Sequence, residues 1–111
     1  MSILKHQTHD IIEPSKKEGV KMIQKKYSEL EEELQMIVPI VARVHGDAHP
    51  EFHDVKRIYD EIHDNIDNAS YDFASSFQSL RDITHNYEIP NDVCQTYEKV
   101  YTSLKALDEA Q

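Results

Sequence analysis

The chain has 111 residues, 39% of them hydrophobic, and a formal net charge of −9 at pH 7 from 21 acidic and 12 basic residues. This length supports one domain with one modest core. The acidic balance argues against nucleic acid and anionic membrane surfaces, because both favour a basic partner. The single cysteine cannot form an internal disulfide, and no apolar run suits a signal peptide or a membrane span. We therefore expect a cytoplasmic protein that binds no nucleic acid and no membrane.

The chain begins with a segment that we expect to form an N-terminal arm, residues 1–14, because Pro14 closes a short stretch of scattered apolar residues. The order Ser15-Lys16-Lys17-Glu18 then has the form of a capping box, which predicts a helix start and a bundle domain over residues 15–111. Apolar residues recur from there at alternating three- and four-residue spacing, which predicts one long helix with a continuous seam. The seam consists of Val20, Ile23, Tyr27, Leu30, Leu34, Ile37, Val41 and Val44.

Two features predict how this long helix bends and ends. Pro39 removes a backbone amide and crowds the preceding turn, so we expect a kink there. Gly46 should end the helix, because glycine takes the left-handed C′ conformation without strain. Pro50 suits the first turn of the next helix, with Asp47 or His49 as its cap. A turn this short makes the two helices antiparallel.

The remainder of the chain carries shorter apolar seams. The second helix is predicted to end where Asp67-Asn68-Ala69-Ser70 interrupts the pattern, with Ser70 as the cap of a third helix. The interruption contains neither Gly nor Pro, so the alternative is three helices, with a continuous helix over residues 50–86. Pro90 marks the break before the last helix, which runs almost to Gln111. The seams consist of Phe52, Val55, Tyr59, Ile62 and Ile66, then Phe73, Phe77, Leu80, Thr84 and Tyr87, then Val93, Tyr97, Val100, Leu104 and Leu107.

Four seams with short links predict an all-α, up-down-up-down four-helix bundle. The first helix, at ~45 Å, would be longer than the second and third, at ~25 Å each. It should overhang them and leave Val20, Ile23 and Tyr27 partly uncovered. Because an uncovered apolar seam is usually buried by another surface, we expect a homodimer. The continuous-helix alternative would make a dimer almost compulsory.

Two blocks of sequence carry a resemblance to a known family. The first reads Val41-Ala42-Arg43-Val44-His45-Gly46, followed by His49-Pro50-Glu51. The second reads Ser79-Leu80-Arg81-Asp82-Ile83-Thr84, then Tyr87, Pro90, residues 93–101, and Leu104, Ala106 and Leu107. Over about residues 20–110 the chain resembles the hemerythrin-like domain of the Ric/ScdA iron–sulfur cluster repair proteins. The resemblance implies a hemerythrin-like bundle.

That family binds a di-iron centre through His and carboxylate ligands from all four helices, and this chain departs from the pattern. No His stands near Tyr27 in the first helix, and the third begins Tyr71-Asp72 instead of His-Asp. The second helix is expected to stop near Ile66, and the chain at Gln111, before the family's His-x-x-x-Glu pairs. We therefore expect a shortened, non-enzymatic relative without catalytic residues or a cofactor. It would act through protein contacts in stress or iron homeostasis.

Four histidines are expected at one end of the bundle, and we favour an interpretation in which they bind no metal. His45 would fix the turn by a hydrogen bond and the others would be solvated. The alternative is a site for iron or zinc, because imidazoles with nearby carboxylates are ligands of both metals. The candidate metal ligands are His45, His49, His53 and His85.

Two more polar side chains have both a structural and a functional interpretation. His63, beside Asp60 and Asp64, is interpreted as a surface histidine. Cys94 falls in the first turn of the last helix, where the helix dipole lowers a thiol pKa. A redox switch at Cys94 is therefore one hypothesis. The favoured interpretation is a half-buried packing cysteine, because Cys94 lies next to the seam residue Val93.

Overall fold

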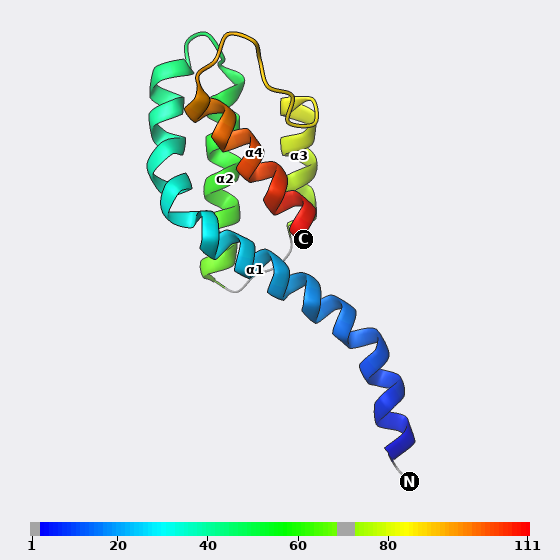
Figure 1. The fold of residues 1–111 in the computed structure, drawn as a ribbon. Helices are drawn as coiled ribbons and strands as arrows, with labels where there is room; N and C mark the ends of the chain where they lie inside the picture. Colours follow the sequence, from blue (N-terminus) through cyan, green and yellow to red (C-terminus); the bar gives the residue numbers. More distant parts are fainter. Residues whose placement is uncertain (1–2, 69–72) are drawn as a thin grey trace.

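The fold of the chain is given by a computed structural model that describes the backbone of residues 3–68 and 73–111 and the side chains of 22–68 and 73–111. It contains α1 (Ile3–His45), α2 (Glu51–Asp67), α3 (Ala74–Thr84) and α4 (Gln95–Ala110), with no strand in those ranges (Figure 1). The predicted all-α four-helix bundle is confirmed. The alternative of a continuous helix over 50–86 is wrong, because α2 and α3 are separate helices.

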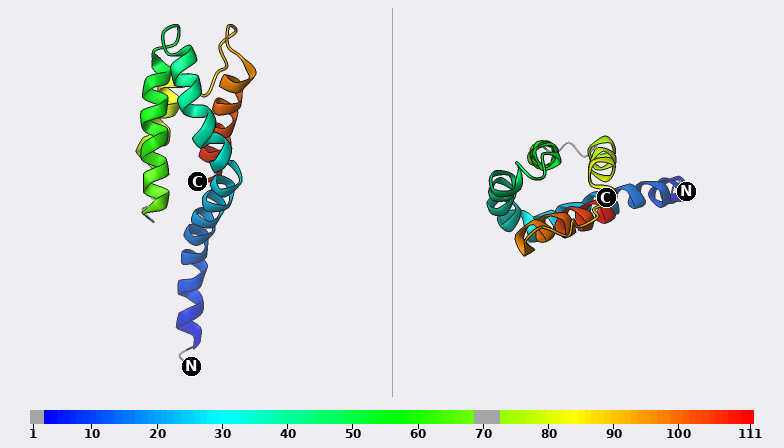
Figure 2. Two further views of the ribbon diagram at one scale, coloured as in Figure 1. Left: turned by 90° about the vertical axis from the view of Figure 1, so that its left-hand side faces the viewer. Right: turned by 90° about the horizontal axis from the view of Figure 1, so that it is seen from above.

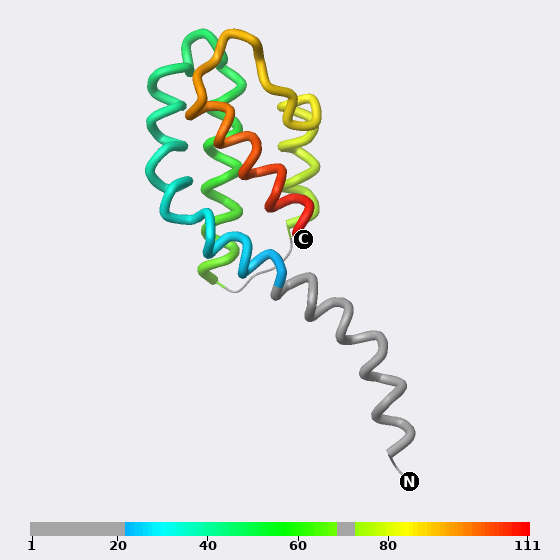
Figure 3. The backbone as a smooth tube through the Cα atoms, in the orientation of Figure 1, coloured from blue at the N-terminus to red at the C-terminus, as the bar shows by residue number. Residues whose placement is uncertain are grey.

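The helices alternate in direction along the chain, and the path can be followed in Figure 3. α1 packs against α4 and α2, and α2 packs against α3 (Figure 2). The α1–α2 turn and the α3–α4 connection lie at the same end of the bundle in both Figures 1 and 2. This end, which we call the loop end, holds most of the polar side chains that the sequence indicates as candidate functional residues.

The start of α1 differs from the prediction. The helix begins at Ile3 and crosses the predicted boundary between residues 14 and 15 without a break, so Ser15 does not start it. A capping box contributes only about 1 kcal/mol, whereas a helix that has already formed extends at little cost per residue. The predicted cap at Ser70 lies outside the described residues, and α3 instead follows Phe73, its N-cap.

The predicted seams mostly form the core, which includes Ile23, Leu34, Phe52, Tyr97 and Leu104 at 0–1% exposure. Val44 is the exception, since 63% of it is exposed. In its place the core contains Val38 and Ala42, which lie beside the seam. An ideal helix has 3.6 residues per turn, so a strict heptad seam rotates away from the core over several turns.

The predicted exposure of the first helix is corrected at two positions. Ile23 and Tyr27 were expected to be partly uncovered, but they are only 1% and 3% exposed. The last residue of α4, Ala110, lines a surface hollow with Met22 and Lys26, so α4 reaches this part of α1. The side chain of Val20 lies outside the described residues. The apolar surface that led us to expect a dimer is therefore covered within the chain at Ile23 and Tyr27.

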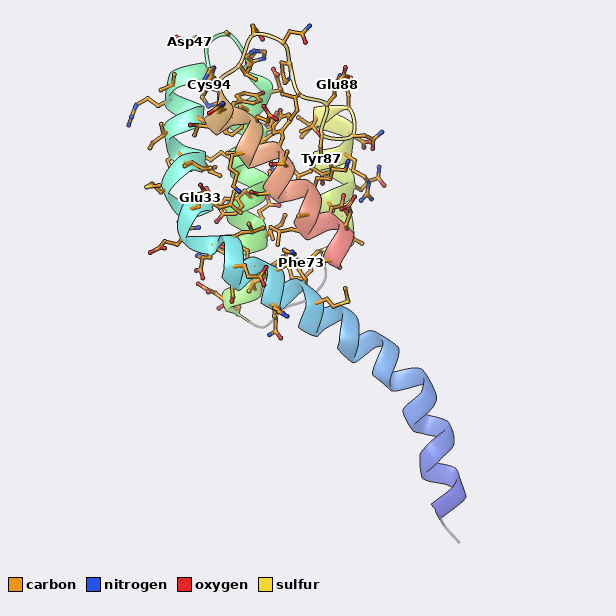
Figure 4. The ribbon with its side chains drawn as sticks, viewed as in Figure 1. Glu33, Asp47, Phe73, Tyr87, Glu88 and Cys94 are labelled. Atoms are coloured by element: carbon orange, nitrogen blue, oxygen red, sulfur yellow. The ribbon has the colours of Figure 1, made fainter. Side chains whose placement is uncertain are left out.

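α1 changes direction in its cyan part, close to Glu33 (Figures 1 and 4). We expected a kink at Pro39. The bend lies on the N-terminal side of that proline, where the missing amide leaves the carbonyl of Gln35 without its helical partner.

Candidate functional site

The loop end is built from the turn after α1 and the longer connection before α4. Figure 4 shows Asp47, Glu88 and Cys94 at this end of the bundle. His45 closes α1, His49 precedes α2, and Cys94 is the residue before α4. Segments far apart in the sequence therefore bring their polar side chains to one surface.

Gly46 allows this turn to close, but not in the way predicted. No glycine among the described residues has a positive φ, so Gly46 is not a left-handed cap. Its amide instead donates to the carbonyl of Ala42 at 3.0 Å. A Cβ at Gly46 would lie 2.3 Å from the Ala42 oxygen and 2.4 Å from Nε2 of His53. Glycine is required here because the backbone and the His53 ring approach too closely for a side chain.

The start of α2 also lacks its predicted cap. Pro50, rather than Asp47 or His49, occupies the N-cap, with φ −61° and no side-chain capping hydrogen bond. The amide of Phe52 donates to the carbonyl of His49 at 2.9 Å, which replaces a side-chain cap with a backbone turn. The imidazole of His49 is thereby left free to bind elsewhere.

His49 joins the two connections of the loop end. Its Nδ1 lies 3.1 Å from Glu51 Oε2, and its Nε2 lies 3.0 Å from Asp92 Oδ1. Burial opposes a charge on this imidazole, but the two carboxylates outweigh burial and raise the pKa of His49. Because a carboxylate accepts from each ring nitrogen, the geometry favours the imidazolium form.

Cys94 is exposed, so the interpretation of a half-buried packing residue is wrong. It is the N-cap of α4, one position before the first turn, and its Sγ lies 3.2 Å from Nε2 of His45. The pKa of the thiol is lowered, chiefly by the amide of Tyr97. Burial opposes this shift, and the amide of Thr96 adds a smaller lowering effect. No geometric capping hydrogen bond closes from the Cys94 side chain, so the amides act mainly as dipoles directed at the sulfur.

The aromatic ring of Tyr97 holds both histidines of this surface in place. The His45 and His49 rings lie edge-on to Tyr97, with centroids 5.3 Å and 5.5 Å away. Tyr97 is fully buried, and its hydroxyl lies 3.0 Å from that of Tyr101. The orientation of His45 toward Cys94 is therefore fixed by the core.

The structure does not gather the four histidines predicted as metal ligands. His45 contacts Cys94, His49 contacts two carboxylates, His53 lies against Gly46, and His85 is exposed after α3. Within residues 22–68 and 73–111, no group of three or more His, Cys, Asp or Glu side chains is placed to hold a metal ion. The metal prediction thus receives no support from the described residues.

His63, interpreted from the sequence as a surface residue, belongs to a buried polar network at the other end of the bundle. Its Nδ1 makes a hydrogen bond with the hydroxyl of Tyr27, which lies 3.0 Å from the hydroxyl of Tyr59. Gln35 donates to Tyr59 at 2.7 Å, and Asp67 lies 3.5 Å from Nε2 of His63. The sequence did contain a signal for the His63–Asp67 contact, because the two residues share a helix face at i, i+4 spacing. α2 ends at Asp67, close to the predicted end near Ile66, and it includes both members of this pair.

No protein-family model and no solved structure matches this chain. The resemblance to the Ric/ScdA proteins therefore depends on its sequence blocks alone. No helix in the described part of the chain is long and apolar enough to cross a membrane. The class that fold and site define is an all-α four-helix bundle with an exposed thiol–imidazole pair at its loop end.

Proposed function

We propose that the protein is a non-enzymatic helical bundle that acts through protein contacts, and that Cys94 is its reactive, regulatory group. The observation that carries this proposal is the thiol–imidazole pair of Cys94 and His45, 3.2 Å apart at the start of α4. Either group alone would be unremarkable on a protein surface. An accessible thiol with a lowered pKa beside a hydrogen-bonding imidazole is typical of reactive cysteines.

The chemistry of this pair is thiol–disulfide exchange. The thiolate of Cys94 attacks one sulfur of a disulfide RSSR, forms the mixed disulfide Cys94–S–S–R, and releases the other half as RS⁻. His45 stabilises the thiolate by donating its Nε2 hydrogen. Cys94 is the only cysteine of the chain, so it has no internal partner and the adduct would persist until an external thiol removed it.

The adduct would alter the surface that Cys94 shares with α1. An adduct replaces the thiolate that contacts His45, the last residue of α1. The neighbouring α1 surface exposes Ile40 and Val44, at 38% and 63%. We infer that modification at Cys94 changes the contacts made by this end of α1.

The test is the rate of Cys94 alkylation by iodoacetamide, followed by mass spectrometry between pH 5 and 9. We expect the folded protein to react faster at pH 7 than the same chain in urea, with a lower pH midpoint. A hydrogen bond to the thiolate should contribute about 0.5–1 kcal/mol, so His45→Gln should slow the reaction roughly two- to fivefold.

His53→Gln is the matched control, because it removes an exposed imidazole of the same end that does not contact the thiol. It should leave the rate unchanged. If folded and unfolded chains showed the same rate and midpoint, Cys94 would be an ordinary surface thiol and the proposal would fail.

The resemblance to the iron–sulfur repair proteins gives a second candidate function, that of a relative of this family in stress or iron homeostasis. The bundle fold agrees with it, and so does the His63–Asp67 pair in the last turn of α2. Metal content and the absorbance spectrum of protein from iron- and zinc-supplemented cells test it. A di-iron stoichiometry with oxo-bridged absorption would show that the family's chemistry survives. If the protein contained no metal, the proposal of a bundle that acts through protein contacts would remain.

A further inference from the structure

A second feature of the loop end is a small surface pocket beneath the α3–α4 connection. Its volume is about 220 Å³, below the ~300 Å³ at which pockets begin to hold drug-sized molecules. It lies between the start of α2, the end of α3 and the middle of α4. Its lining includes Ile83, Pro90 and Tyr101 as apolar walls, with Glu51, Glu88 and His85 as polar groups.

The charge of this pocket is negative. Its lining contains two carboxylates and no Lys or Arg. Glu51 accepts a hydrogen bond from His49, but the carboxylate of Glu88 has no hydrogen-bond or ion-pair partner in the described part of the chain. Burial raises the pKa of the Tyr101 hydroxyl, followed by its hydrogen bond to Tyr97, and the charge of Glu51 raises it further.

The rim of the pocket is a fixed turn. His85, Asn86 and Tyr87 have φ values of 53°, 61° and 65°, a left-handed run that L-residues rarely adopt. The buried hydroxyl of Thr84 accepts from the amide of Tyr87 at 2.8 Å. The ring hydroxyl of Tyr87 donates to Asp108 at 2.9 Å, so the turn is fastened to α4. Strained backbone of this kind persists where a site is held in one shape.

We propose that this pocket binds an organic cation, an amine or guanidinium on a short apolar chain. The charged head would lie near Glu88, because Glu51 is already paired with His49. The apolar chain would lie against Ile83 and Pro90, with the almost fully buried Tyr101 ring beneath them. A metal ion does not suit it, because the described residues provide no group of three metal-binding side chains. The inference depends on the pocket alone and does not require a reactive Cys94.

The test is a titration with n-butylamine and n-butylguanidine, followed by NMR shifts of the Ile83 methyl and Tyr101 ring signals. We expect saturable shifts confined to the pocket, and none with the uncharged n-butanol. Glu88→Gln should weaken binding about three- to tenfold. Glu98→Gln removes an exposed carboxylate of α4 that does not line the pocket, and it should leave the affinity unchanged. Circular dichroism of both variants establishes that each is folded.

The same cation could come from a free amine or from a Lys or Arg side chain of another protein. A blocked Gly-Lys-Gly peptide separates the two sources. Binding at least as tight as that of n-butylamine would identify a protein side chain, and exclusion of the peptide would identify a free amine. The proposal is overturned if neither cation gives saturable shifts, if n-butanol matches them, or if the two glutamate variants lose affinity equally.

Discussion

The two ends of the bundle arrange polar groups in opposite ways. At the loop end, His45, His49 and Cys94 lie at or near the surface, and each contacts a group from another segment. At the other end, Tyr27 and Tyr59 are 3% and 1% exposed, and their hydroxyls bond to each other inside the bundle. The first arrangement leaves reactive groups accessible, whereas the second satisfies polar atoms that the core has enclosed.

The difference shows in the direction of the pKa shifts. Burial raises the pKa of Tyr27, with a further contribution from its hydrogen bond to Tyr59, so the hydroxyl stays protonated. Backbone amides lower the pKa of the Cys94 thiol, where burial has a smaller effect. Burial also raises the pKa of Tyr97 at the loop end. The contrast therefore lies in the accessible Cys94, whose charged form the amides of α4 favour. We therefore interpret the loop end as the functional end and the tyrosine network as structural.

The largest effect is expected from breaking the turn of the loop end with Gly46→Ala. Its φ is not positive, so alanine would normally stabilise the chain by about 0.4–1 kcal/mol through the unfolded state. The clash with the Ala42 carbonyl should reverse this and lower the free energy of unfolding by about 2 kcal/mol. Urea denaturation measures this change in the free energy of unfolding.

The double variant Gly46→Ala/His53→Ala tests the cause of that loss. It removes the contact with the His53 ring but keeps the contact with the Ala42 backbone, so we expect only partial recovery. If Gly46→Ala alone were more stable than the parent protein, the close approach at this position would not be needed for the turn.

A smaller effect is expected from removing one buried hydroxyl at each end. Tyr27→Phe removes a hydroxyl that bonds both Tyr59 and His63, and should cost about 1–2 kcal/mol. Tyr97→Phe removes a hydroxyl that bonds only Tyr101 in the described part of the chain, and should cost about 0.5–1 kcal/mol. Thermal and urea unfolding measure both. Equal losses would mean that the network at His63 adds nothing beyond a single hydrogen bond.

The sequence was informative where the signal was local. The 3–4 spacing of apolar residues located the helices and most of the core, including Phe52, Phe77 and Leu104, because helical periodicity does not depend on distant residues. It failed at Val44, where the drift between 3.5 and 3.6 residues per turn accumulates. It also failed at Ser15, where a strong local cap signal did not start the helix, which begins at Ile3.

The contacts of the candidate site could not be predicted from the sequence, for a different reason. The Cys94–His45 contact joins residues 49 positions apart, and the Tyr27–His63 contact joins residues 36 apart. Composition and spacing carry no information on such pairs until the bundle brings its ends together. The local part of the Cys94 prediction did succeed, since its place at the start of α4 and its lowered pKa agree with the expectation from the helix dipole.

The smallest effect is the pH dependence contributed by His49. Glu51 and Asp92 raise its pKa in the folded chain above the ordinary 6.5, after overcoming burial. A raised value means that the folded state binds the proton more tightly, so the stabilisation is complete below about pH 6.5. It is lost as the pH rises through the higher folded-state value. The contribution should be under about 1 kcal/mol, because Asp92 is largely exposed.

Urea unfolding at intervals from pH 5.5 to 8.5 measures this term, with His49→Gln as the variant. The variant should lose the fall in stability over that range, while His53→Gln, which lacks a carboxylate partner in the described residues, should keep it. If His49→Gln retained the full pH dependence, the two carboxylates would not be holding a charged imidazole. The link between the α1–α2 turn and the α3–α4 connection would then depend on the packing of His49 against Tyr97.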